Sequence, residues 1–216
     1  MTFPSSSDSR AAPLSATTGS PRVAALLWIG LVALAVCGRL WQPHWNGQPL
    51  WNATPLAAVA LAAGAVFGRS LLAASVPLAG LFLSNLALPG YENVGMAAVV
   101  YLATAWPVLL GGFVRSGRLP AVVTGALASS LVFFLATNLA HWLLTVDYPR
   151  TMAGLATCFA AALPFYRWMP VGDVAWSVVV FAGLAALARL TGLTQLSGLC
   201  GLPGPARLTA AGTIQE

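Results

Sequence analysis

The chain has 216 residues, of which 58% are hydrophobic and only 7% are charged. Soluble domains carry about 25% charged residues, so this composition excludes a soluble globular protein and indicates an integral membrane protein. The formal net charge of +5 comes from ten arginines scattered between apolar segments, which excludes a nucleic-acid-binding patch and instead orients membrane helices.

The chain begins with a polar segment. Residues 1–21 are rich in serine, threonine, alanine and proline, which predicts a disordered cytoplasmic tail. The apolar run after Arg22 resembles a signal peptide ending at Cys37, but Val36 precedes this cysteine where a lipoprotein signal requires a smaller residue. We therefore expect the run to be the first membrane helix.

Six apolar segments approach the length of about 20 residues that a membrane-spanning helix needs. They predict an all-α integral membrane protein, an S-component-like six-helix transmembrane bundle within residues 22–190. A seventh stretch, residues 151–166, is interrupted by Gly154 and Pro164, and we expect a re-entrant or interfacial helix there. Residues 191–216 are expected to form a flexible cytoplasmic tail. The six expected spans cover residues 23–41, 54–68, 70–88, 95–114, 119–144 and 172–190.

The arginines indicate how these spans are oriented. Cytoplasmic loops carry an excess of positive charge, and six spans with both termini inside place most of the arginines in the cytoplasm. We therefore expect a multi-pass protein of a bacterial cell (inner) membrane. The arginines then expected on the outer side are Arg39, Arg150 and Arg167.

Polar side chains collect at the outer end of the fifth expected span, within residues 129–150. Thr137, Asn138 and His141 lie about one helical turn apart and can share a helix face. Hydrocarbon tolerates such groups only when they face protein or a water-filled cavity, so we predict a ligand site here. The expected substrate-binding residues are Asn85, Asn138, His141, Trp142, Asp147, Tyr148 and Arg150.

Tryptophans gather at the same expected end and predict a pocket with flat aromatic walls. Simpler interpretations stay open for the polar residues. Asn138 and His141 also fit hydrogen bonding between helices, and Asp147 and Arg150 fit an exposed ion pair. Thr54 and Asp173 fit helix N-caps. The tryptophans concerned are Trp41, Trp45, Trp51, Trp142, Trp168 and Trp176.

The second expected span contains overlapping pairs of small residues four positions apart. Such faces let helix backbones approach closely. The pattern fits internal packing, and it also fits docking onto a partner membrane protein. The residues expected at a partner-docking face are Ala53, Ala57, Ala58, Ala62 and Gly64.

Motifs for catalysis and for energy coupling are missing from the sequence. It contains no nucleotide-binding G-x-x-x-x-G-K-[ST], no H-E-x-x-H and no G-x-S-x-G. Cys37, Cys158 and Cys200 stand far apart, without the spacing of a metal knuckle. We therefore expect no metal, no cofactor and no enzymatic activity. A membrane-embedded enzyme that uses His141 and Asp147 as an acid–base pair is a less favoured alternative.

Several segments resemble an uncharacterised bacterial membrane-protein family, a domain of unknown function ascribed to transport. The F-F-x-x-T-N block near Asn138 and the Y-P-x-T-x-x-G-L block from Tyr148 are its most specific motifs. The family pattern has Asp where this chain has Asn85, so a charge is missing from the expected site. The resembling segments are residues 52–65, 129–142, 147–155 and 158–166.

That family is similar in turn to the substrate-binding S components of energy-coupling-factor vitamin transporters. The resemblance implies a protein that holds a small nutrient or vitamin-like molecule near the outer face. It also implies a transmembrane coupling protein with ATPase subunits as partner. We therefore predict a substrate-binding uptake subunit in the lipid bilayer for an uncharged or aromatic ligand, without nucleic-acid binding. A structural or regulatory bundle without transport activity is the alternative.

Overall fold

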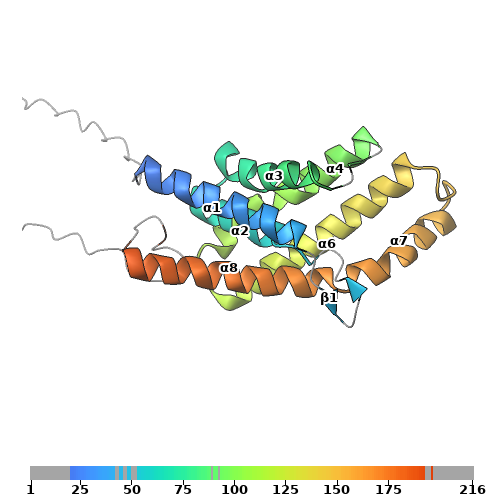
Figure 1. The fold of residues 1–216 in the computed structure, drawn as a ribbon. Helices are drawn as coiled ribbons and strands as arrows, with labels where there is room; N and C mark the ends of the chain where they lie inside the picture. Colours follow the sequence, from blue (N-terminus) through green and yellow to red (C-terminus); the bar gives the residue numbers. More distant parts are fainter. Residues whose placement is uncertain are drawn as a thin grey trace, which may run out of the picture.

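The computed structural model describes residues 20–41, 44–45, 48–49, 53–88, 90–91, 93–192 and 196, and the two expected tails lie almost wholly outside them. This part of the chain is a bundle of helices with one small β-hairpin (Figure 1). The hairpin joins β1 (His44–Trp45) to β2 (Gln48–Pro49) in an antiparallel pair. The helices are α1 (Pro21–Leu40), α2 (Leu56–Phe67), α3 (Leu71–Asn85), α4 (Val94–Ala105), the 3₁₀ helix η1 (Trp106–Leu110), α5 (Gly111–Val114), α6 (Leu119–Leu144), α7 (Met152–Tyr166) and α8 (Met169–Thr191).

Four helical segments of the described chain are long and apolar enough to cross a membrane: α1, the continuous segment Val94–Val114, α6 and α8. The expectation of an all-helical membrane-type protein is therefore confirmed. Two expected spans are shorter than predicted, because α2 has 12 residues and α3 has 15. At about 1.5 Å per residue they measure only about 18 and 22 Å, against a hydrocarbon core of about 30 Å.

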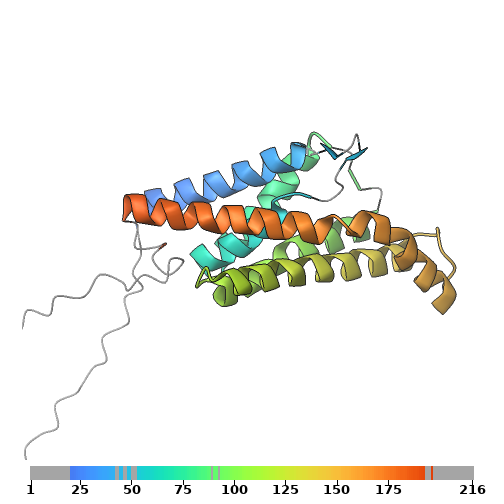
Figure 2. The same cartoon turned by 90° about the horizontal axis from the view of Figure 1, so that it is seen from below.

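The two ends of the bundle are distinct. Both the beginning of α1 and the end of α8 lie at one end, called here the terminal end, and the β-hairpin lies towards the other, the hairpin end (Figures 1 and 2). α6 runs to the hairpin end, and α7 and α8 both run back towards the terminal end. α7 is thus a separate short helix, as residues 151–166 predicted. Its position relative to a membrane stays a prediction.

α2 is the central helix of the bundle. It contacts α1, α3, α4, α5, α6, α8 and η1, and its residues from Ala58 to Ala65 are all buried. A helix that is surrounded by protein is apolar on every side, which explains why its small residues show no polar stripe. Because α2 is central, its small residues face other helices of the same chain.

Glycines let α2 touch the segment that crosses it. A Cβ atom added at Gly64 would overlap the backbone carbonyl of Val108, and one added at Gly111 would overlap the backbone of Gly64. Pro107 lies in η1, where the chain leaves α-helical geometry because proline supplies no N–H donor. The two backbones therefore meet without an intervening side chain.

The expected docking face is inside the bundle. Ala58 and Ala62 have no exposed surface, Ala53 is 7% exposed and Gly64 is buried. Ala57 is half-buried and lines a cavity. The assignment of this face to a docked partner is therefore wrong for the arrangement seen here, and internal packing is the interpretation that the structure supports.

Candidate ligand-binding cavity

A cavity of about 310 Å³ lies in the half of the bundle nearer the hairpin end. Residues of α1, α2, α3, α4, η1, α6 and α8 enclose it, so it sits among the helices and not on the surface of one of them. Its volume is at the small end of the range of about 300–1,000 Å³ for small-molecule sites. Its polar lining consists of Arg39, Thr54, Tyr91, Thr104, Ser129, Thr137 and Asp173.

Arg39 supplies the positive charge of this cavity from the last turn of α1. Its Nη1 donates hydrogen bonds to Ser84 Oγ at 2.8 Å, to Asn85 Oδ1, and at 3.4 Å to the Leu81 carbonyl. The guanidinium therefore sits at the C-terminal turn of α3, where the helix dipole favours a cation. These bonds fix the arginine on the wall formed by α1 and α3.

Asn85 has a supporting place in this arrangement. It accepts the hydrogen bond from Arg39, and its Nδ2 donates to Tyr101 Oη on α4 at 3.4 Å. Asn85 does not itself line the cavity. The residue predicted to bind substrate thus positions the arginine that does face the cavity.

Asp173 supplies a carboxyl group from the wall formed by α6 and α8. Its side chain is 2% exposed and accepts a hydrogen bond of 2.6 Å from Ser130 Oγ on α6. The N-cap interpretation of Asp173 is wrong, because α8 begins at Met169 and the aspartate lies inside the helix. Buried carboxylates need such partners, because desolvation of an unpaired charge is costly.

Thr54 was also interpreted as an N-cap, and that assignment is wrong as well. α2 begins at Leu56 with Pro55 at the cap position, and no side-chain hydrogen bond caps the helix. Thr54 lines the cavity instead. Both corrections have one cause: the proline-containing starts of α2 and α8 shift the helix boundaries by a few residues from those expected.

A second cavity of about 200 Å³ lies between α6, α7 and the beginning of α8. It shares Phe133, Thr137 and Met169 with the first cavity, so these residues form a common wall. Asn138 lines this second cavity, and its Nδ2 donates to the Phe134 carbonyl of its own helix at 2.8 Å. Among the predicted substrate-binding residues, Asn138 is the one that the structure places beside either cavity.

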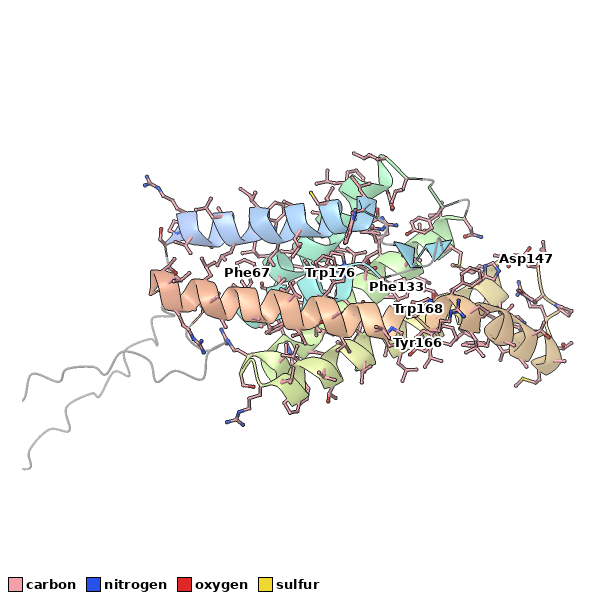
Figure 3. All side chains as sticks on the ribbon, turned by 60° about the horizontal axis from the view of Figure 1, so that its bottom comes forward. Phe67, Phe133, Asp147, Tyr166, Trp168 and Trp176 are labelled. Atoms are coloured by element: carbon pink, nitrogen blue, oxygen red, sulfur yellow. The ribbon has the colours of Figure 1, made fainter. Side chains whose placement is uncertain are left out.

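The other predicted site residues lie together at the connection between α6 and α7, called here the tip. His141 Nε2 lies 3.0 Å from Asp147 Oδ2, and the Tyr148 ring meets the His141 ring edge-on at 6.1 Å between centroids. The side chains of His141 and Asp147 are 37% and 58% exposed. Figure 3 shows Asp147 at the far end of the tip, away from Phe133 and Tyr166.

Trp142 and Arg150 hold the chain of the tip in place. Trp142 Nε1 donates to the Pro149 carbonyl at 2.9 Å, and Arg150 Nη2 donates at 2.8 Å to the carbonyls of Leu143 and Thr145. The alternative interpretation of Asp147 and Arg150 as an exposed ion pair is wrong for the described residues, since Asp147 pairs with His141. The cluster foreseen from the sequence thus exists, but its contacts fasten a connection and it lines neither cavity.

The aromatic walls also differ from those expected. None of the described tryptophans lines the larger cavity, whose aromatic side chains are Tyr91 and Phe133. Trp176, for example, donates its indole N–H to the Ala53 carbonyl at 3.3 Å. A sequence signal for the missed residues did exist: Arg39 and Asp173 are charges within or beside apolar segments, which marks functional positions in membrane proteins.

A protein family matches most of this chain. A profile described as "Family of unknown function (DUF6580)" matches residues 19–196, a range that includes both cavities and the tip. No curated protein matches the chain. No solved structure matches it. The expected membership of an uncharacterised family is therefore confirmed, and the match does not extend to the S components of vitamin transporters.

Proposed function

Because the chain belongs to the family of unknown function DUF6580, we propose a function from its own geometry: it is a multi-pass membrane protein that captures a small molecule in the 310 Å³ cavity. The observation that carries this proposal is the cavity itself. Residues of α1, α2, α3, α4, η1, α6 and α8 surround it, and polar side chains line it where a bundle held only by packing would be filled with apolar side chains.

The path of the chain supports six membrane crossings. α1, α2, α3 and the segment Val94–Val114 run in alternating directions along the bundle, even though α2 and α3 are short (Figure 1). α2 is enclosed by neighbouring helices, so its ends meet protein and it need not match the thickness of the bilayer. α7 and α8 run the same way and count together as one crossing.

The distribution of charge supports an outward-facing cavity. The terminal end carries five arginines of the described chain, while the hairpin end carries three together with Asp147 and Asp173. By the excess of positive charge in cytoplasmic loops, the terminal end is cytoplasmic and the cavity lies in the outer half of the membrane. The five arginines at the terminal end are Arg22, Arg69, Arg115, Arg118 and Arg189.

Uptake of the captured molecule would require a partner. The sequence has no nucleotide-binding motif, so a coupling membrane protein with ATPase subunits would supply the energy. Such a partner would contact a surface other than the buried alanine face of α2. The exposed apolar side chains of α3 and α4, such as Leu72, Phe82 and Leu102, are available for contact with lipid or protein.

Mass spectrometry of small molecules retained by the gently purified full chain tests the proposal. We expect the wild type and the control Ala156→Leu, at an exposed position of α7, to retain the same molecule. Ala103→Leu and Ala57→Leu place extra volume in the cavity and should each abolish retention.

The rival is a structural or regulatory bundle. It would be supported if nothing is retained and if no compound of a vitamin and metabolite panel raises the melting temperature. A ligand at 100 times its Kd stabilises the folded state by about 2.7 kcal/mol, so genuine binding is measurable in this way.

A further inference from the structure

The larger cavity carries one positive and one negative side chain, and their arrangement indicates what it binds. Resting on the capture function proposed above, we propose that the captured molecule is a small zwitterion of amino-acid type. Its anionic group meets Arg39 and its ammonium group meets Asp173.

The two charges are held on separate walls. Arg39 is tied to Ser84 and Asn85 at the end of α3, and Asp173 is tied to Ser130 on α6. Arg39 and Asp173 both line the cavity and form no ion pair with each other, since the ion pair found among the described residues joins His141 to Asp147. Opposite charges in an apolar bundle attract strongly, so each must be fixed by its own contacts for the space between them to stay open.

This arrangement selects against molecules with a single charge. A cation attracted to Asp173 would be repelled by Arg39, and an anion attracted to Arg39 would be repelled by Asp173. An uncharged molecule would offer a counter-charge to neither side chain. A zwitterion satisfies both walls, so discrimination arises from repulsion of the alternatives as well as from attraction. The sequence led us to expect an uncharged or aromatic ligand. The two charged side chains in the cavity favour a zwitterion instead.

The size and the remaining lining suit a molecule of this class. A volume of about 310 Å³ corresponds to roughly ten water molecules at about 30 Å³ each. Leu56, Leu81 and Phe133 provide an apolar wall for a hydrocarbon or aromatic side chain. The hydroxyl groups of Thr104 and Thr137 can hydrogen-bond the remaining polar atoms of the ligand.

Matched sets of probes test this inference on the full chain in detergent. Each set contains a free L-amino acid, its amide, which keeps only the positive charge, and its N-acetyl derivative, which keeps only the negative charge. Leucine, phenylalanine and methionine provide three sets, and the melting temperature and titration calorimetry provide the readouts. We expect at least one free amino acid to bind about tenfold or more tightly than both of its derivatives, because each derivative loses a charged hydrogen bond.

Substitutions on the two walls should invert this preference. Asp173→Asn removes the negative wall and should make the N-acetyl derivative the best ligand, while Arg39→Gln should make the amide the best ligand. The same substitutions at the tip, Asp147→Asn and Arg150→Gln, lie outside the cavity and should leave the preference unchanged. Arg39→Lys keeps the charge and should keep the preference for the zwitterion, and it replaces Arg39→Gln if that variant does not fold.

In the probe experiments, three results would overturn the inference. They are no binding of any free amino acid, equal binding of the singly charged derivatives, and a preference that the wall substitutions leave unaltered. If the molecule retained after purification is neutral or singly charged, the zwitterion inference fails while the capture function stands. The capture function itself fails only if no molecule is retained and no compound of the wider panel binds.

Discussion

The two halves of the bundle use α2 in opposite ways. Towards the terminal end, Gly64 meets Gly111 and the backbones touch, so no space remains between the helices. Towards the hairpin end, Ala57 of the same helix and Ala103 of α4 line an open cavity. Small residues therefore bring two helix backbones into contact only where both helices carry a small residue at the crossing point. Elsewhere, as at Ala57 and Ala103, the space between the helices stays open.

Polar contacts fasten each wall of the open half to a neighbouring helix. Arg39 binds the end of α3, and Ser130 binds Asp173, so α1 is fastened to α3 and α6 to α8 around the cavity. The closed half also has a polar contact between α1 and α3, from Trp28 Nε1 to Ser75 Oγ at 2.9 Å, and close backbone approach at the α2 crossing adds dispersion contacts.

The closed half should be the more sensitive to added volume. Gly64→Ala and Gly111→Ala are expected to destabilise the fold by about 2–3 kcal/mol, because each new methyl group meets backbone that cannot move aside. Equilibrium unfolding in mixed detergent micelles measures the change. Gly112→Ala is the matched control, since its added Cβ meets nothing within 4 Å, and it should be neutral or stabilising by up to about 1 kcal/mol. Equal effects at Gly111 and Gly112 would refute the backbone contact.

In the open half, the two adjacent serines of α6 should differ. Ser130→Ala leaves the buried carboxyl of Asp173 without its hydrogen-bond donor and should cost about 1–3 kcal/mol. Ser129→Ala loses only a bond of 2.7 Å to the Gly125 carbonyl of the same helix and should change the stability little. The same unfolding assay compares the two. If Ser129→Ala were the costlier change, the contact between α6 and α8 would not hold the wall.

The tip should respond least of all. His141→Ala and Asp147→Asn each break an exposed pair and should lower the free energy of unfolding by about 0–1 kcal/mol. Neither change should alter which molecule the purified protein retains, because neither residue lines either of the two cavities described. The double variant should match the single variants in stability. Loss of retention in His141→Ala would move the binding site to the tip and reverse the assignment made here.

Local sequence signals located most of the helices. The expected span 119–144 coincides with α6, and the stretch 151–166 is a separate short helix that Thr151 caps and that continues through Gly154 and Pro164. The expected lengths of the second and third spans were too large. Hydropathy cannot distinguish a helix enclosed by protein from one exposed to lipid, since both are apolar throughout.

The candidate site was foreseen less well. The local crowding of polar residues from Asn138 to Arg150 was visible, yet those contacts close a connection between two helices. The cavity instead combines Arg39 with Asp173, two residues 134 positions apart that only the packing of the bundle brings to one space. No periodicity within one helix can indicate such a pairing.

The sequence by itself determined that this is an apolar helical protein with few charges, because composition and hydropathy act on each segment separately. It also determined which residue types gather near the hairpin end. The tertiary structure alone decided that the alanine face of α2 is buried, and that Arg39 and Asp173 face one cavity while the residues of the tip line neither of the two cavities described. The physical reason is that the direction of a side chain in a bundle depends on which helices are neighbours, and that is a property of the whole chain.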